Sequence, residues 1–387
     1  MKAKTVTLGS IATITSGGTP DRQRLEYWGG NIPWVKTTLI QNCEIKREDI
    51  DETITEEGLK KSSAKIIPAG SILMAMIGQG KTRGQVALLN SNAAINQNGA
   101  ALILNDGIDA RYVYQQLLFR YDELRNASNS SGQQNLNAAL IRSFRIPRVA
   151  ANQQPLIGTL LKEWDSAIEK AEHLVAAKSR QLSQFRERLV GRGSSKQTRL
   201  REATRESLAR NGSTLGRNQI MGVTNDCGMR PMREETIAAS IDRYKIVRPR
   251  AFAYNPMRLN VGSIAISAFE RDVLVSPDYV VFECDESKLL ASYLNHLRFT
   301  RHWKSYFDVA GSGSVRVRIY YDDLAALTIP LPPIEQQHRA VAILDTAAAE
   351  IDCLVKYSGA LRRQKRGLMQ KLLTGKWRLP LPEPEAA

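Results

Sequence analysis

Cysteine is scarce in this sequence of 387 residues, and its spacing argues against the usual cysteine-based sites. The four cysteines are Cys43, Cys227, Cys284 and Cys353. No two of them form a Cys-x-x-Cys pair, and no histidine lies at metal-binding spacing from them. The sequence therefore predicts neither a zinc site nor a disulfide framework, and free thiols suit a reducing compartment.

Long apolar runs are missing as well. Residues 1–10 lack the apolar core of a signal peptide, and no stretch approaches the length that crosses a membrane. Composition is otherwise that of ordinary globular proteins, with 43% hydrophobic and 6% aromatic residues. We expect a cytoplasmic protein with no membrane partner, long enough for two domains with cores of their own.

Acidic residues are too few to balance the basic ones. There are 39 Asp and Glu against 54 Lys and Arg, which gives a formal charge of +15 and a pI near 9.7. Such a balance favours polyanionic partners, nucleic acid first among them. The excess is marked between Lys178 and Arg210, where it indicates either a solvated helix face or a stripe that contacts phosphates.

A complete nucleotide-binding motif is also lacking. Residues from Ala75 to Thr82 fit the loose form of a phosphate-binding loop, which would make the chain a P-loop nucleotide-binding enzyme. That loop needs a helix that begins at its Lys-Thr, whereas Gly84 and a strand-like run follow Lys81 here. The pattern favours a basic β-hairpin, with the P-loop enzyme as an alternative.

Catalytic constellations are not evident elsewhere. Asn255-Pro256-Met257 lacks the second proline and the aromatic residue of an amino-methyltransferase loop, and none of the four histidines lies in a convincing triad setting. We therefore expect no catalytic residue, no bound cofactor and no metal in this chain.

What the sequence does contain is a second copy of part of itself. The stretch from Ile146 to Arg192 recurs without a gap from Ile329 to Gly375, at an offset of 183 residues. Gln153-Gln154 in the first copy aligns with Gln336-Gln337 in the second. A period this long holds a globular segment plus one helix, so it predicts a pseudo-two-fold internal repeat with two similar surfaces.

Both copies carry apolar residues at seven-residue spacing, which is typical of a coiled-coil seam. Ser358 and Lys365 interrupt the second copy. A helix of about 40 residues would span about 60 Å and needs a partner for its seam. We expect an antiparallel coiled coil rather than two unrelated amphipathic helices. The seam positions are Leu161, Ile168, Val175, Leu182, Leu189, Leu344, Ile351, Leu354, Leu361, Leu368 and Leu372.

The segments that precede the two copies also resemble each other. Each has the pattern of short strands and turns followed by a helix and a small polar loop. The expected fold class is α/β, in the α+β sense, with two similar globular domains separated by the two helices. We expect a globular domain at 1–145, a central helix at 146–195, a second globular domain at 196–328, a C-terminal helix at 329–376 and a tail at 377–387.

Several motifs follow one another along the chain. They are, in order, Leu8-Gly9-Ser10-Ile11-Ala12, Gly17-Gly18-Thr19-Pro20, the run from Tyr27 to Val35, the run from Val275 to Phe282, and the run from Ile329 to Gln337 that leads into a helix ending Leu372-Leu373-Thr374-Gly375-Lys376. In this order they resemble the motifs of the DNA-specificity subunits of Type I restriction-modification systems, and the resemblance covers nearly the whole chain. The first copy departs from the family pattern, with Ala150-Ala151-Asn152 where the second copy has Pro333-Ile334-Glu335.

This resemblance implies a non-catalytic subunit whose two target-recognition domains each read half of a bipartite site in double-stranded DNA. A helical spacer of about 60 Å could set the two readers more than one turn of DNA apart. The resemblance also implies two modification subunits that methylate adenine with S-adenosylmethionine, and restriction subunits that use ATP and magnesium. A general DNA-binding scaffold is a further alternative.

Candidate DNA-contacting residues are those whose chemistry suits base edges or phosphates and which lie in expected loops. Trp28 and Trp34 are expected to pack in a core rather than to stack on bases. The candidates are Lys36, Thr37, Lys81, Arg83, Gln85, Gln133, Gln134 and Asn135 in the first domain, and Asn218, Gln219, Arg243, Asn255, Arg258, Ser312, Ser314, Arg316 and Arg318 in the second.

Overall fold

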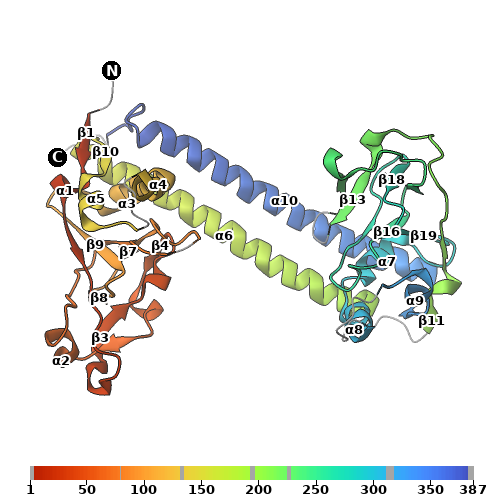
Figure 1. The fold of residues 1–387 in the computed structure, drawn as a ribbon, viewed down its shortest axis with the longest axis horizontal. Coiled ribbons are helices and arrows are strands. Elements are labelled where there is room, and N and C mark those ends of the chain that lie inside the picture. Colours follow the sequence, from red (N-terminus) through yellow and green to blue (C-terminus); the bar gives the residue numbers. More distant parts are fainter. Residues whose placement is uncertain are drawn as a thin grey trace, which may run out of the picture. The chain divides into compact units, whose positions relative to one another are not determined.

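The computed structural model describes residues 4–78, 80–130, 135–191, 197–224, 228–310 and 318–381. They fall into two compact units, each of which contains part of both long helices (Figure 1). The first unit ends at Ala171 and resumes at Tyr357, and the second comprises Glu172–Lys356. Both units mix helices and sheets, so the expected α+β fold class is confirmed.

The first unit is built on a five-stranded sheet of order β2-β9-β6-β7-β4. Ile72 and Met74 of its central strand belong to one hydrophobic core, whereas Leu73 and Ala75 belong to another. A strand buried on both faces needs an uninterrupted apolar run, which this strand has. The strands are β2 (Ala12–Ser16), β9 (Gly99–Leu104), β6 (Ile72–Ala75), β7 (Val86–Leu89) and β4 (Cys43–Ile45), of which β4 runs parallel to β7 and the other neighbours are antiparallel.

Helices cover one face of this sheet, because Tyr112, Val113 and Leu117 of α3 lie in the same core as Ile72. A smaller sheet of order β5-β3-β8 adds the core around Trp34. The remaining elements of the first unit are β1 (Thr5–Thr7), α1 (Leu8–Ile11), η1 (Leu25–Tyr27), β3 (Trp28–Val35), η2 (Thr37–Leu39), η3 (Arg47–Asp49), β5 (Thr53–Ile54), α2 (Glu56–Lys60), β8 (Ala94–Ile95), α3 (Ala110–Phe119), α4 (Tyr121–Ser130), α5 (Ala138–Ser143), β10 (Arg145–Pro147) and η4 (Ala151–Gln153).

The second unit repeats this plan with a four-stranded antiparallel sheet of order β12-β19-β16-β17. This order matches β2-β9-β6-β7 of the first unit strand for strand. Phe252 and Tyr254 of the central strand again face one core, and Ala253 faces another. The strands are β12 (Thr204–Glu206), β19 (Val280–Cys284), β16 (Phe252–Tyr254) and β17 (Ile264–Ile266).

Two-stranded pairs and short helices complete the second unit. They are β11 (Gln197–Arg199) with β20 (Thr328–Pro330), β13 (Met221–Thr224) with β14 (Gly228–Pro231), β15 (Lys245–Val247) with β18 (Val273–Val275), the helices α7 (Ala291–Leu297), α8 (Arg301–Ala310) and α9 (Tyr321–Ala325), and the 3-10 turns η6 (Leu200–Glu202), η7 (Arg217–Gln219) and η8 (Glu234–Thr236).

The long helices are α6 (Gln154–Arg186), which continues as a π-helical turn (η5, Glu187–Gly191), and α10 (Ile334–Leu372). Ion pairs join them at Asp165 and Lys365 in the first unit and at Lys178 and Glu350 in the second. Residue numbers rise along one helix as they fall along the other, so the two form an antiparallel coiled coil (Figure 1). All the seam positions are buried or half-buried.

Both helices begin later than their repeated segments do. Ile146 lies in β10, where it pairs with Val6, and Ile329 lies in β20, where it pairs with Thr198. The Ile-Pro dipeptide thus closes a two-stranded ribbon in each unit, because proline suits a strand edge better than a helix interior. The spacing of apolar residues alone could not separate this strand from the helix that follows it.

The shared glutamine explains why the repeat keeps its register. In the first unit Gln154 Oε1 accepts from Asp109 N at 3.1 Å, and its Nε2 donates to the Val149 carbonyl at 3.2 Å. In the second unit Gln337 Oε1 accepts from Leu290 N at 2.9 Å, and its Nε2 donates to the Pro332 carbonyl at 2.9 Å. The acceptor carbonyl lies five residues upstream in each case, and each glutamine fastens a long helix to the start of α3 or α7.

Candidate nucleic-acid interface

The turn between β6 and β7 carries three of the sequence candidates, Lys81, Arg83 and Gln85. Strands β6 and β7 pair antiparallel, with Met74 opposite Val86. In the described part of this turn no helix begins at Lys81, so its amides cannot form the anion cradle that a phosphate-binding loop requires. The P-loop alternative is therefore not supported, and the segment is the hairpin that the sequence favours.

The residues after the first polar loop return to this same turn. Leu136 N donates to the Met76 carbonyl at 3.0 Å, which sets the exposed Asn135 beside the end of β6. Lys81 is exposed, whereas Gln85 is half-buried. We call residues 76–85 with 135–136, as far as they are described, the first rim.

The second unit builds an equivalent site at the same place in its sheet. Ile319 N donates to the Pro256 carbonyl at 3.1 Å, which brings Arg318 to the turn between β16 and β17. Arg258 and Arg318 are both exposed there. Asn255 Oδ1 accepts from Met257 N at 3.0 Å, so its carbonyl oxygen holds the turn. We call residues 255–263 with 318–319 the second rim.

Lys36 and Thr37 lie apart from the first rim in the sequence, in a segment rich in ion pairs. Lys36 Nζ is 2.8 Å from Glu52 and 3.2 Å from Asp51, and hydrogen bonds to these carboxylates raise the pKa of Lys36. Two acidic partners make Lys36 a weaker candidate for a phosphate contact than Lys81. Thr37 Oγ1 donates to Asn96 Oδ1 at 2.6 Å.

Sequence reasoning missed the polar turn Asn96-Gln97-Asn98 between β8 and β9. Asn96 contacts Thr37, Gln97 bonds Thr19, and the Asn98 carbonyl accepts from Met76 N at 2.9 Å. This turn therefore connects Thr37 with the first rim. Three consecutive amide side chains between two buried strands were the signal that could have identified it.

Gln219, another second-domain candidate, is held away from the second rim. Gln219 accepts from Gly216 N and donates to the Asp272 carbonyl, so it stabilises η7 at the start of β13. Asn218 and Arg243 are exposed. The second rim contacts β13 near its C-terminal end, where Ser263 Oγ donates to the Val223 carbonyl at 3.2 Å. Gln133, Gln134, Ser312, Ser314 and Arg316 lie outside the described residues.

The glycines of the Gly17-Gly18-Thr19-Pro20 motif have a packing role. A Cβ at Gly17 would lie 2.1 Å from the Ile95 carbonyl oxygen, and one at Gly18 would lie 2.3 Å from Ala64 N. Trp34 is 2% exposed and donates from Nε1 to the Gly18 carbonyl at 3.0 Å. The Trp28 ring packs edge to face against the Trp34 ring, with the two ring centroids 5.1 Å apart. Both indoles thus pack as expected rather than forming a surface for base stacking.

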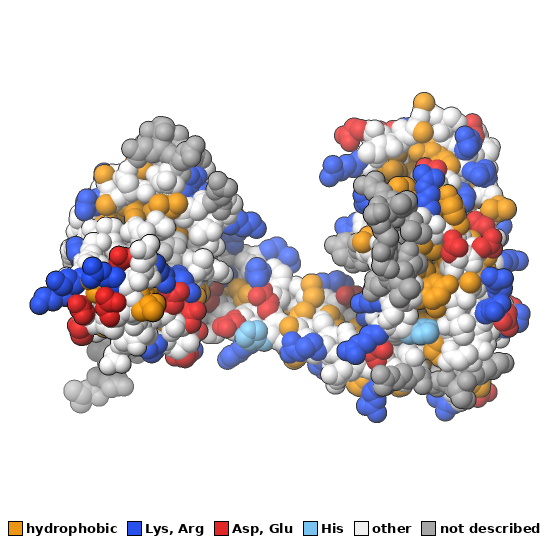
Figure 2. Space-filling view, turned by 60° about the horizontal axis from the view of Figure 1, so that its bottom comes forward, with side chains coloured by type: hydrophobic (Ala, Val, Ile, Leu, Met, Phe, Trp, Pro, Cys, Tyr) orange, Lys and Arg blue, Asp and Glu red, His pale blue; other side chains and the backbone are white. Residues whose placement is uncertain are grey.

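Charge by itself does not locate an interface. Figure 2 shows Lys and Arg side chains dispersed over the drawn face and interspersed with Asp and Glu, without one continuous basic patch. Among the described residues no cluster of three or more His, Cys, Asp and Glu could hold a metal ion. Nor does any helix within the described ranges have the length and apolarity to cross a membrane.

Part of the chain is similar to known proteins. The family model of the Type I restriction modification DNA specificity domain matches residues 2–176. The specificity subunit of the Escherichia coli Type I restriction enzyme EcoR124I/EcoR124II is 31% identical over 171 residues, and that of Methanocaldococcus jannaschii MjaIX is 30% identical over 164 residues. Each match covers 41% of this chain, and 40% and 37% of the respective relative, so the chain spans about two fifths of the length of these curated relatives.

The fold is shared over a longer range than the sequence. The crystal structure of a Type I restriction-modification S subunit from M. genitalium has a TM-score of 0.58 at 12% identity, and the alignment covers 96% of both chains. This likeness shows that the two chains share a fold. Residues 2–176 thus match the DNA specificity domain of Type I restriction-modification systems, and the chain is similar to specificity subunits of such systems over about two fifths of its length.

Proposed function

We propose that this chain is the sequence-reading subunit of a Type I restriction-modification complex. It binds a bipartite site in double-stranded DNA, and it directs adenine N6-methylation or cleavage by partner subunits without catalysing either reaction. The observation that carries this proposal is the pair of rims. Each lies at the same turn of the same sheet, yet one presents Lys81, Arg83, Gln85 and Asn135 and the other Asn255, Arg258 and Arg318.

Equivalent positions with different side chains are what two readers of different half-sites require. Exposed arginine and lysine can contact phosphates or the edge of guanine, and asparagine and glutamine amides can pair with adenine. We assign the two target-recognition domains to residues 1–145 and 196–328, and the spacer helices to 146–195 and 329–376. The residues that contact DNA are then on turns at the edge of a rigid sheet.

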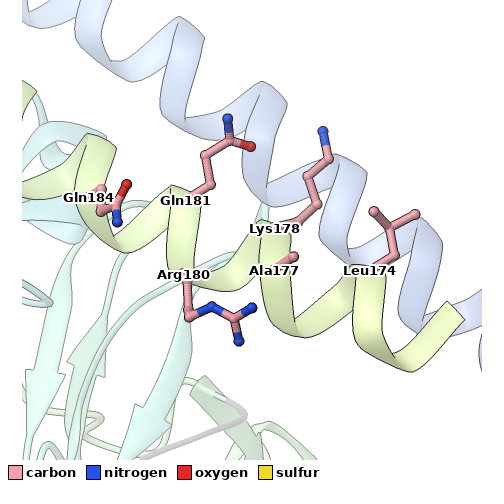
Figure 3. Close-up of a pocket in the computed structure, with 6 residues that line it drawn as sticks. All are labelled: Leu174, Ala177, Lys178, Arg180, Gln181 and Gln184. Atoms are coloured by element: carbon pink, nitrogen blue, oxygen red, sulfur yellow. The ribbon is translucent and has the colours of Figure 1, made fainter. Parts of the chain in front are cut away.

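The outer faces of the long helices suit protein partners. In the second unit Leu174, Ile343 and Val355 expose 43%, 49% and 52% of their surface. An open groove of about 350 Å³ runs along α6 beside Leu174, Ala177 and Gln181. Figure 3 shows Lys178 and Gln181 projecting from one side of α6 and Arg180 from the other. Such a mixture of apolar and polar groups is typical of subunit interfaces.

We assign this face to modification subunits, two of them because the helix segment occurs twice. S-adenosylmethionine would bind to those subunits, and ATP and magnesium to the restriction subunits. The complex would act in the cytoplasm, where its DNA substrate lies.

A methylation map tests the function directly. N6-methyladenine is mapped across the genome of cells that carry an active modification subunit, with and without this chain. We expect a split motif that is methylated only when the chain is present. If no new methylation appears, the chain would be a general DNA-binding scaffold instead.

Exchange of residues 1–145 for the corresponding domain of another family member tests the modular reading. We expect one half of the methylated motif to change and the other half to persist, because each rim contacts its own half-site. A change in both halves, or in neither, would contradict two independent readers.

A further inference from the structure

A cavity of about 330 Å³ opens beside the second rim, between the β16–β17 turn, the residues that follow α7, and helix α8. Its size lies at the lower end of the range of small-molecule sites. Trp303 and Phe307 are 4% and 2% exposed and form an aromatic wall, with their ring centroids 5.2 Å apart. The cavity is also lined by Asn260, Arg298 and Lys304, which supply polar and positively charged groups.

Arg298 brings a positive charge to this cavity. Its Nη1 donates to the Ile264 carbonyl at 2.9 Å and its Nε donates to Asn295 Oδ1 at 2.8 Å, and no carboxylate of the described residues forms an ion pair with it. The guanidinium groups of Arg298 and Arg186 lie 4.0 Å and 4.3 Å from the centroid of the Phe299 ring. Burial, together with the charge of Arg186, lowers the pKa of Arg298 to about 10. An anion would relieve this concentration of charge.

The first unit shows what can fill the equivalent space. Gly84 and Gly262 occupy matching turns, with φ angles of +87° and +89°. A Cβ on Gly84 would lie 3.6 Å from the ring of Tyr121, whereas one on Gly262 would meet no atom within 4 Å. The Tyr121 hydroxyl donates to the Lys81 carbonyl at 2.5 Å. In the second unit Lys304 of α8 lines the space beside Gly262. An aromatic ring therefore closes the turn in the first unit, whereas the turn in the second unit stays open.

We propose that this cavity, here called the Arg298 pocket, receives one unstacked nucleotide. The base would take the place that Tyr121 fills in the first unit, against Trp303 and Phe307, and the phosphate would lie near Arg298 and Lys304. Aromatic rings and arginine are the groups that bind unstacked bases in proteins. The favoured source is the bound DNA, because the pocket adjoins the second rim, and to that extent the inference rests on the proposed function. A free nucleotide has the same chemistry and is the other source.

Two substitutions at one position separate charge from space. Lys304→Ala removes the charge and leaves the pocket open, whereas Lys304→Tyr installs the residue that the first unit already accommodates. The full chain is titrated with dAMP, and with deoxyribose 5-phosphate as a probe that lacks the base. We expect saturable binding of dAMP, a several-fold loss in Lys304→Ala, and a loss of at least about tenfold both in Lys304→Tyr and for the probe without a base.

The source is distinguished with duplexes that carry 2-aminopurine at successive positions of the methylated half-site. Fluorescence should rise at one position with the wild type and with Lys304→Ala, but not with Lys304→Tyr. If the chain binds the duplex without that rise in fluorescence and does not bind dAMP, the Arg298 pocket does not receive a nucleotide. The proposed function would be unaffected by that result. Equal dAMP binding by wild type and Lys304→Tyr would also contradict a nucleotide in the Arg298 pocket. If dAMP binding depends on residue 304 but the chain binds no specific duplex, the pocket binds a free nucleotide and the proposed function is contradicted.

Discussion

Lys365 of α10 forms an ion pair with Asp165 of α6 inside the seam of the coiled coil, with Nζ and Oδ1 2.5 Å apart. Lys365 is only 8% exposed, and the other carboxylate oxygen of Asp165 accepts from Gln115 Nε2 at 2.7 Å. At the 183-residue offset the counterparts are Leu182 and Ala348, which are apolar. The first unit therefore has an ion pair at the two positions where the second unit has apolar side chains.

Asp165→Ala should destabilise the protein, because it leaves the Lys365 ammonium in the seam without its carboxylate. We expect a loss of roughly 1–3 kcal/mol in the free energy of unfolding, less than for a fully buried pair because the Asp165 side chain is 46% exposed. The double variant Asp165→Ala, Lys365→Leu should recover most of that loss. Urea denaturation followed by circular dichroism measures both.

Lys178 provides the control for this prediction. Its pair with Glu350 is exposed, with 33% and 49% of the two side chains accessible. Lys178→Ala should change stability by less than about 1 kcal/mol. An equal loss from both single variants would mean that burial of the Lys365 pair has no special effect.

Gln337→Leu should cost more stability than Gln154→Leu. Gln337 is fully buried and its amide also donates to the Lys288 carbonyl at 2.8 Å, whereas Gln154 is 7% exposed and its two bonds are longer. Each buried backbone group left without a partner costs roughly 1–3 kcal/mol. Hydrogen exchange at the Leu290 amide should accelerate in the first variant, and exchange at the Asp109 amide in the second.

The neighbouring Gln336 is exposed and serves as the control for both glutamines. Gln336→Leu should leave the exchange of Leu290 and Asp109 unchanged. Protection of Leu290 that survives Gln337→Leu would show that the side-chain amide does not hold α7 to α10.

Stability of the second unit should fall with acid because of His296. Its Nε2 lies 2.8 Å from Asp345, and Arg186 Nε donates to its Nδ1 at 3.3 Å, so the ring is held neutral. Burial lowers the pKa of His296 below its ordinary 6.5, Arg186 and Arg298 act in the same direction, and Asp345 opposes them. His296 therefore binds a proton more readily in the unfolded chain than in the folded one. The contribution of the neutral ring to the stability of the folded state is present above about pH 6.5 and is lost as the pH falls below that value.

His296→Gln should flatten this pH dependence when urea midpoints are measured between pH 5 and pH 7.5. His338→Gln is the matched control, because His338 is exposed on α10. An unchanged slope in His296→Gln would assign the acid sensitivity to other groups.

Arg258→Ala and Arg318→Ala should each weaken DNA binding and reduce its salt dependence. Both side chains are exposed at the second rim. Each lost phosphate contact lowers the slope of log affinity against log salt by about one. Binding of the methylated motif is measured by fluorescence anisotropy across a salt series.

Arg250→Ala is the control for the second rim. Arg250 lies just before the start of β16, at the end of that strand away from the second rim. Its Nε and Nη2 donate to Glu286 Oε1 at 3.0 Å and 2.9 Å. Its removal should leave the slope unchanged. A slope that falls equally in all three variants would mean that the second rim has no special role.

Much of the fold could be predicted from the sequence because the information is periodic or local. The seven-residue spacing, the 183-residue offset and the glycine after Lys81 each depend on residues close in the chain or on a repeat within it. They were sufficient to predict the paired helices and the hairpin in place of a nucleotide loop.

The sites depended instead on contacts between distant segments. The sequence shows Lys365 only as an interruption of a heptad, and the structure brings it to Asp165 from 200 residues away. Thr37 meets Asn96, and Asn135 reaches the end of β6, only after the sheet has formed. The same holds for the space left open by Lys304.

Hydrophobic periodicity and repetition are properties of the chain alone, and they are enough to predict a duplicated α+β protein whose two helices pair through their seams. The start of each long helix, the polar residues that gather at each rim and the turn that borders a pocket are defined in the folded structure. Those outcomes depend on which side chains fill the same volume, and segments distant in sequence supply them.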